Sequence, residues 1–169
     1  MEGSMREIKY NFLHWGPFVT HYQLSQEEIN SFKELTPGQD FRKGLAGHLK
    51  DEYELDKNRV FTLIHPYLLS YVQGFFDNRK KKLTNGFELQ NAWINHQKKN
   101  EFNPPHTHDD DLSFVLYTEI PEGLEAECKN SVSNSPGPGC IVFDFNIPGG
   151  SFNNLFLTTH AHLPSVGDM

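Results

Sequence analysis

Residues Asn103–Tyr117 read NPPHTHDDDLSFVLY and hold the densest group of metal-competent side chains in the sequence. Two imidazoles and three carboxylates fall within six residues, directly behind a stiff Pro-Pro pair. Residues 112–118 then alternate between two largely apolar faces, a pattern that predicts a strand buried inside a sandwich. The stretch therefore places ligand-type side chains where a strand begins.

His106 and His108 are separated by one residue, so on a strand both side chains would point to the same face and could meet one ion. Imidazole nitrogens suit first-row transition metals such as Fe(II), and a His-x-His pair leaves room for another ligand and for exchangeable positions. His108 and Asp110 offer a second arrangement, the His-x-Asp half of a two-His, one-carboxylate set. In the competing interpretation, the pair ends a solvated loop and residues 109–111 are surface charge.

Four further residues are candidates on weaker grounds. His160 and His162 repeat the His-x-His spacing on a later predicted strand, so either could supply a distant metal ligand. Asn95 and Tyr117 could line a cosubstrate pocket next to the metal, although strand packing explains them equally well.

Length and charge limit the possible partners. A chain of 169 residues is long enough to fold as one domain around a single core. Its net charge of -7 argues against a nucleic acid or an anionic membrane as the main partner, because both favour basic surfaces. No apolar run approaches the roughly 20 residues that span a bilayer.

The two cysteines and the N-terminus suggest a cytoplasmic protein. Cys128 and Cys140 lack Cys-x-x-Cys spacing and follow no signal peptide, so free thiols in a reducing cytoplasm are expected. Residues 1–5 (MEGSM) lack the apolar core of a targeting segment and are typical of a cloning remnant before the native start.

The first half of the chain favours helices. Ser25 and Glu28 form a capping box that predicts the start of a short helix ending at Leu35. Apolar residues at every fourth position predict a helix over 41–53, and the closer pattern over 59–77 predicts the best helix of the chain. Pro66 is expected to kink that helix or to mark its first turn.

The second half favours short strands. Alternating patterns predict strands over residues 87–97, 112–118, 141–145 and 155–163. Helices followed by strands predict an α+β, mainly β fold, a sandwich or half-open barrel with N-terminal helices packed on one sheet.

Residues Glu101–His108 followed by Leu112–Tyr117 resemble the 2-oxoglutarate/Fe(II)-dependent dioxygenases, specifically the small members common in marine phages and marine environmental sequences. The likeness extends upstream through Ala92–Asn95, and downstream through 135–143 to Pro164–Met169. It covers about half of the chain well and the N-terminal helices loosely.

The resemblance implies a double-stranded β-helix, or jelly roll, that binds Fe(II) and 2-oxoglutarate and hydroxylates an unknown substrate. It implies His106 as the first metal ligand and His108 in the usual carboxylate position. Asp110 stays as a rival ligand, because His-x-Asp is the common order in the family. For a phage protein, the place of action would be the host cytoplasm.

In this family, a Pro-x-x-Gly-Asp turn precedes the strand that carries the distal histidine, and a later Arg or Lys pairs with 2-oxoglutarate. Residues 164–169 match that turn, so the expected domain, 1–169, lacks its closing strands, one ligand and the cosubstrate anchor, and is inactive alone. His160 and His162 precede the turn and are therefore weaker candidates for the distal ligand. A sandwich without its last strands exposes sheet edges, so self-association is also expected.

Two other functions stay open. In a non-catalytic, phage-associated jelly-roll module for binding or structure, the histidine pair would be incidental. A cupin-type metalloenzyme without 2-oxoglutarate would use His106 and His108 together with His160 or His162.

Overall fold

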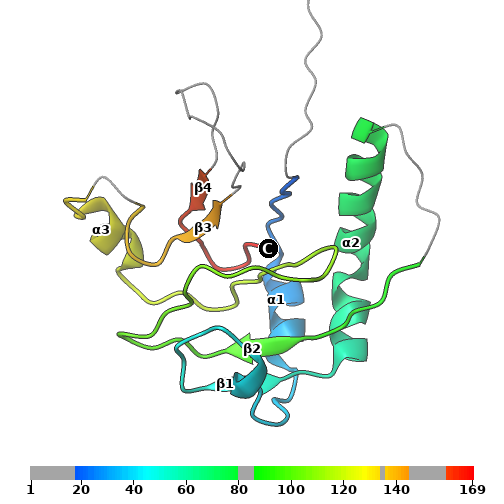
Figure 1. Ribbon diagram of the computed structural model, residues 1–169, viewed down its shortest axis with the longest axis horizontal. Coiled ribbons are helices and arrows are strands. Elements are labelled where there is room, and N and C mark those ends of the chain that lie inside the picture. Colours follow the sequence, from blue (N-terminus) through cyan, green and yellow to red (C-terminus); the bar gives the residue numbers. More distant parts are fainter. Residues whose placement is uncertain (1–17, 80–85, 134–135, 145–158) are drawn as a thin grey trace, which may run out of the picture.

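The computed structural model describes residues 18–79, 86–133, 136–144 and 159–169. Within these residues, two helices lie side by side and two small sheets lie apart from each other (Figure 1). The elements are α1 (Gln26–Lys33), the 3-10 helix η1 (Arg42–Gly44), β1 (Glu52–Glu54), α2 (Lys57–Arg79), β2 (Trp93–Asn95), α3 (Leu124–Lys129), β3 (Ile141–Asp144) and β4 (Thr159–His162).

The helix start predicted at Ser25 is confirmed. The Ser25 hydroxyl accepts a hydrogen bond from the Glu28 amide at 3.3 Å, and the Ser25 amide donates to the Glu28 carboxylate at 2.8 Å. These two bonds satisfy amides that have no partner in the first turn of a helix. Residues Ile29 and Phe32, on one side of α1, are buried.

The long helix predicted over 59–77 is confirmed as α2, which begins at Lys57 and ends at Arg79. Asp56 precedes it and accepts a hydrogen bond from the Asn58 amide at 2.9 Å. Pro66 therefore lies inside the helix and does not mark its first turn.

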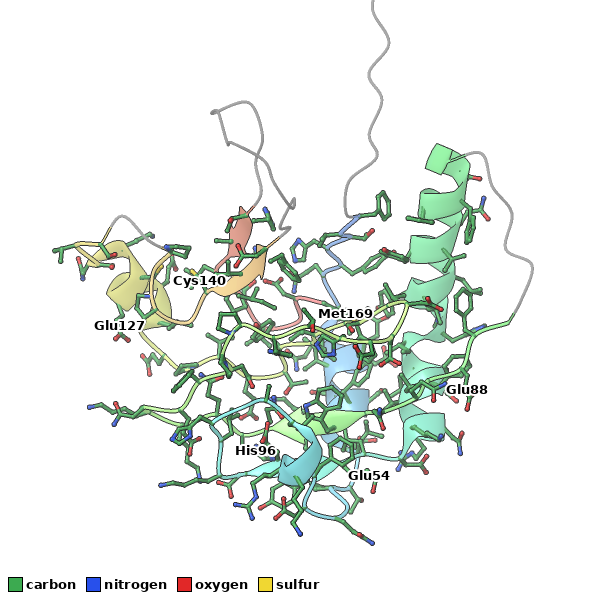
Figure 2. The ribbon with its side chains drawn as sticks, in the orientation of Figure 1. Glu54, Glu88, His96, Glu127, Cys140 and Met169 are labelled. Atoms are coloured by element: carbon green, nitrogen blue, oxygen red, sulfur yellow. The ribbon has the colours of Figure 1, made fainter. Side chains whose placement is uncertain are left out.

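The core lies where α1 packs against α2. Removing a Leu or Phe side chain from water contributes roughly 1.5–3 kcal/mol, so this contact supplies much of the stability of the fold. Leu116 and Met169 pack against the same cluster from distant parts of the chain, which brings the C-terminal residues next to α1 (Figure 2). The buried members are Leu24, Ile29, Phe32, Leu35, Val60, Ile64 and Ala92.

A tyrosine pair next to this core joins α2 to the residues before α1. The rings of Tyr22 and Tyr67 meet edge to face with centroids 5.2 Å apart, and the Tyr22 hydroxyl donates to the Tyr67 carbonyl at 3.2 Å. The Tyr67 hydroxyl donates to the carboxylate of Glu28. Burial, together with this hydrogen bond, raises the pKa of Tyr67 to about 12, so the phenol stays protonated and keeps α2 tied to the cap of α1.

The jelly roll expected from the sequence is wrong for the described residues. These residues form a mixed α/β structure with two separate two-stranded antiparallel sheets, β1–β2 and β3–β4. In the predicted strand over 112–118, Tyr117 is the only residue with backbone hydrogen bonds to another segment among the described residues. Phe114 and Val115 are 40% and 46% exposed, so the apolar alternation there does not correspond to a covered sheet face. The predicted packing of N-terminal helices on a sandwich sheet is wrong for the same reason.

The helix predicted over 41–53 is also wrong, because the chain doubles back there. Phe41 donates from its amide to the Glu52 carbonyl at 3.0 Å, and η1 and β1 replace the helix. His48 donates from its amide to the Phe102 carbonyl at 2.8 Å, so this stretch also pairs with a distant segment. The four-residue spacing is only a local signal and does not report such pairing.

The remaining elements agree in part with the sequence. β2, β3 and β4 fall within the ranges predicted for strands, while residues 145–158 lie outside the described part of the chain. α3 was not predicted. Cys128 on α3 and Cys140 next to β3 are free thiols with their sulfur atoms 3.9 Å apart.

Two predictions concern partners: one excludes a membrane, and the other is self-association through an exposed sheet edge. Within the described residues, no helix has both the length and the apolar character needed to cross a membrane. Self-association through a sheet edge stays a prediction.

One carboxyl group in the fold is buried without a partner. Glu52 on β1 is 1% exposed, and neither of its carboxyl oxygens has a hydrogen-bond partner among the described residues. Burial raises the pKa of Glu52, because the charged form loses its water and gains no donor.

Replacing Ser25 with Ala should destabilise the protein by about 1 kcal/mol, because the capping box loses its hydroxyl. Urea unfolding measures this loss. The matched control is Ser31→Ala in the same helix, which should change stability by less than about 0.5 kcal/mol. Equal effects of the two substitutions would contradict the role assigned to the cap.

Replacing Glu52 with Gln should make stability less dependent on pH. A carboxyl group with a raised pKa in the folded state contributes most below its unfolded pKa of about 4.3 and loses that contribution as pH rises through the folded value. The variant should therefore gain stability relative to the parent as pH rises from about 4 to about 8, measured by urea unfolding.

The control for this prediction is Glu54→Gln, which changes an exposed residue of the same strand. If the difference between Glu52→Gln and the parent stays constant across that pH range, Glu52 does not titrate as described.

Candidate metal-binding sites

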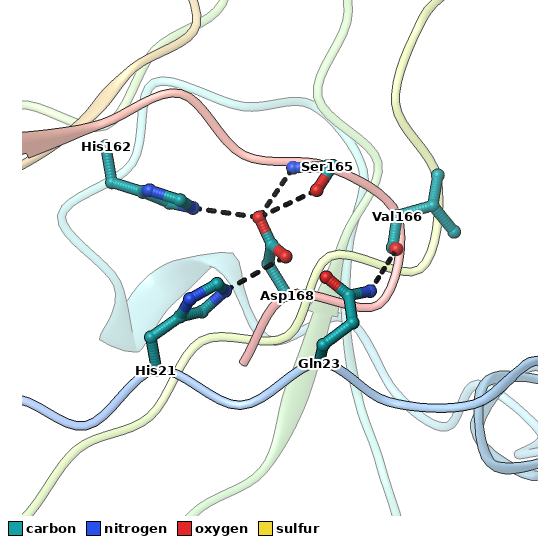
Figure 3. A network of polar contacts seen from close by, with 6 residues as sticks. All are labelled: His21, Gln23, His162, Ser165, Val166 and Asp168. Atoms are coloured by element: carbon teal, nitrogen blue, oxygen red, sulfur yellow. Dashed lines mark hydrogen bonds and ion pairs between the residues drawn. The ribbon is translucent and has the colours of Figure 1, made fainter.

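A cluster of His21, His162 and Asp168 is the first candidate site (Figure 3). His162 ends β4, Asp168 follows in the C-terminal turn, defined here as residues 165–169, and His21 precedes α1. The Nε2 atom of His162 lies 2.8 Å from Asp168 Oδ2, and that of His21 lies 3.0 Å from Asp168 Oδ1. The two imidazole rings have centroids 4.9 Å apart. We call this group the His-Asp-His cluster.

Backbone pairing places Asp168 between two segments. On one side, the Tyr22 amide donates to the Met169 carbonyl at 2.7 Å, and the Met169 amide donates to the Tyr22 carbonyl at 3.0 Å. On the other side, the Tyr117 amide donates to the Asp168 carbonyl at 2.9 Å, and the Gly167 amide donates to the Tyr117 carbonyl at 2.8 Å. The C-terminal turn is thus held from both sides, as the middle strand of a small sheet would be.

Gly167 is required at its position for two reasons. Its φ of +92° lies in the region that residues with a side chain rarely adopt. A Cβ atom there would also fall 2.6 Å from Gln23 Nε2 and 2.9 Å from the Leu24 carbonyl. Any side chain at position 167 would therefore separate the C-terminal turn from the residues before α1.

The two oxygens of Asp168 have different surroundings, although the residue as a whole is only 3% exposed. Oδ2 accepts hydrogen bonds from the Ser165 amide at 2.7 Å and the Ser165 hydroxyl at 3.0 Å, and it also contacts His162. Oδ1 is buried and has no aligned hydrogen bond within the described structure; its contact with His21 is an ion-pair distance only.

These contacts keep Asp168 ionised. Burial alone would raise its pKa, but hydrogen bonds from the Ser165 amide, His162 and other neighbours outweigh burial and hold the pKa well below its usual range. A buried carboxylate between two imidazoles is a good ligand set for a divalent metal.

His106 and His108 form the second candidate site, which we call the histidine pair. The sequence predicted that they lie where a strand begins, but they lie on an exposed loop. Their ring centroids are nevertheless only 4.9 Å apart. His106 Nδ1 lies 2.8 Å from the Pro104 carbonyl oxygen. Because a carbonyl can only accept, Nδ1 carries the hydrogen and Nε2 keeps its lone pair if the ring is neutral.

The structure does not gather the other predicted residues around this pair. Of the side chains that it describes, only the His-Asp-His cluster combines three possible ligand groups with atoms within 4.8 Å of one another. Asp110 is exposed on the loop, and Asn95 is exposed at the end of β2, opposite Glu52. His160 stacks on Phe143 with ring centroids 6.2 Å apart.

Two predicted residues lie at the His-Asp-His cluster instead. His162 is one of its members, and Tyr117 pairs with the C-terminal turn through its backbone. Burial raises the pKa of the Tyr117 phenol, and the nearby Asp168 carboxylate adds to this effect.

Sequence reasoning missed His21 and Asp168 as site residues. His21 has no ligand-spaced neighbour, so no pattern distinguishes it from a solvated histidine. Asp168 carried a weak signal, because Ser165-x-x-Asp168 has the spacing of a turn in which the carboxylate accepts from the serine amide.

Comparisons with known proteins give no relative for this chain: no protein-family model, no curated protein and no solved structure matches it.

Proposed function

We propose that this chain belongs to a 2-oxoglutarate- and Fe(II)-dependent oxygenase and that the histidine pair supplies two of its metal ligands. The observation that carries the proposal is the 2.8 Å contact between His106 Nδ1 and the Pro104 carbonyl. In metal sites, a histidine commonly donates its second N–H to a carbonyl or carboxylate, which fixes the ring and its tautomer. Pro104 plays that part here and directs the lone pair of Nε2 away from the backbone.

The position of the histidine pair suits a site that exchanges ligands. Both rings are exposed, so a small chelating acid and O2 could reach a metal held between them. Pro104 and Pro105 restrict the backbone just before His106 and lower the entropy lost when the loop is fixed by an ion. Asp110 on the same loop is the proposed third ligand in this chain, since carboxylates complete such sets.

The support for the oxygenase reaction itself comes from one short stretch of sequence. It comes from the resemblance of residues 101–117 to the dioxygenases, because the described residues do not form the jelly roll of that family. When bound, Fe(II) with 2-oxoglutarate would supply the oxidising chemistry, and the protein would hold and orient the metal. The substrate class stays open.

The test begins with Fe(II) binding under anaerobic conditions, followed by addition of 2-oxoglutarate. We expect the parent protein to bind Fe(II) and to develop a visible charge-transfer absorption when 2-oxoglutarate chelates the iron. The double variant His106→Gln/His108→Gln should lose this absorption and bind Fe(II) at least about tenfold more weakly, since two ligands are gone. Asp110→Asn should weaken binding if the carboxylate is a ligand.

The matched control is His65→Gln, which removes an exposed imidazole on α2. It should leave the absorption unchanged. Iron binding that does not respond to the double variant would overturn the proposal. Iron binding that does respond, without any 2-oxoglutarate signal, would reject chelation of 2-oxoglutarate by this chain and favour a metal centre that does not use 2-oxoglutarate.

A further inference from the structure

We propose that the His-Asp-His cluster is a separate divalent-metal site that links the residues before α1 to the C-terminal turn. The proposal goes beyond the oxygenase reaction, because it concerns other ligands and makes the metal a structural link. It rests on three features of the cluster: its distances, the oxygen of Asp168 that lacks an aligned hydrogen bond, and the way in which that carboxylate is held.

The distances are close to those between neighbouring ligands of one ion. When nitrogen and oxygen ligands bind at about 2.1 Å, adjacent ligand atoms lie roughly 3.0–3.4 Å apart. The two imidazole nitrogens lie 2.8 Å and 3.0 Å from the Asp168 oxygens, and ligand atoms of all three residues lie within 4.8 Å of one another. Small movements of His21, which is about half exposed, would bring the three groups around one ion.

The second reason is the incomplete hydrogen bonding of one Asp168 oxygen. Asp168 Oδ1 is buried and lacks an aligned hydrogen bond among the described residues, which is costly for an ionised group. The oxygen faces His21, whose Nε2 lies 3.0 Å from it (Figure 3). An ion bound by Oδ1 and the imidazoles would give this oxygen a cationic partner. His162 Nε2 would exchange its contact with Oδ2 for the ion, while the two hydrogen bonds from Ser165 to Oδ2 would remain.

The surroundings of Asp168 resemble the outer shell of a metal site. Ser165 donates two hydrogen bonds to Oδ2 and so fixes the plane of the carboxylate. Gln23 donates from its side chain to the Val166 carbonyl at 2.9 Å and holds the turn against the segment that carries His21. These contacts place the ligands before any metal arrives.

The ligand types select the metal class. Two imidazoles and one carboxylate favour Zn2+, Co2+ or Fe2+ over Mg2+ and Ca2+, which prefer oxygen ligands. Because His21 is exposed on one side, water would complete the coordination. The ion would connect two segments that are far apart in the sequence, so its binding should raise the stability of the fold.

The experiment uses the whole chain, freed of metal with a chelator, and Co2+ or Zn2+ as the probe. Co2+ absorption reports coordination by nitrogen and oxygen, and thermal unfolding with increasing Zn2+ reports the link between segments. We expect a rise in melting temperature that grows with free Zn2+. His21→Gln and His162→Gln should each weaken Co2+ binding at least about tenfold and remove the rise.

His160→Gln is the matched control, because it removes an imidazole from the same strand as His162. It should leave both readouts unchanged. Circular dichroism confirms that each variant is folded, and His21→Gln is the more informative variant because its side chain is about half exposed.

The double variant His106→Gln/His108→Gln separates this inference from the proposed function. If it retains the zinc-dependent rise while His21→Gln loses it, the cluster is a metal site whether or not the oxygenase proposal holds. If His21→Gln and His162→Gln bind Co2+ as the parent does, or if Zn2+ does not change the melting temperature of the parent, the cluster is only a polar contact and the inference is wrong.

Discussion

The buried carboxylate of Asp168 is the constraint on which the arrangement of the two ends of the described chain depends. It is ionised and almost fully enclosed, so it must be surrounded by donors or by a cation. Ser165 meets part of this need from within the C-terminal turn, while His162 and His21 approach from β4 and from the segment before α1. A local turn thus becomes the place where three segments meet.

The same contact positions the hydrophobic core. Tyr22 and Met169, the residue after Asp168, exchange two backbone hydrogen bonds. These bonds bring Met169 against the hydrophobic core between α1 and α2. On the other side of the C-terminal turn, Tyr117 forms backbone hydrogen bonds with Gly167 and Asp168. Its neighbour Leu116 packs against the same hydrophobic core. Polar and apolar contacts therefore agree on one arrangement of distant segments, which is typical of a sequence that specifies a single structure.

The sequence predicted the features that depend on neighbouring residues. The capping box at Ser25 and the periodic pattern of α2 are local signals, and both helices are present. The predicted helix over 41–53 failed because Phe41 pairs with Glu52 and His48 with Phe102, contacts that no local pattern reveals. The alternation over 112–118 predicted a strand inside a sandwich, which is wrong: Phe114 and Val115 are exposed, and the backbone pairing shown for this stretch is that of Tyr117 with the C-terminal turn.

For the sites, the limits are similar. The proximity of His106 and His108 follows from their spacing, although they lie on a loop. His21 and Asp168 come from opposite ends of the described chain, and only the folded backbone brings them together. Gly167 gives this arrangement a marker that can be read in other sequences. Since its backbone angle and its close neighbours both exclude a side chain, a chain sharing this arrangement should keep Ser-x-Gly-Asp together with a histidine a few residues before a helix cap. Finding both in one unassigned sequence would identify a structural relative by a criterion that does not need overall similarity.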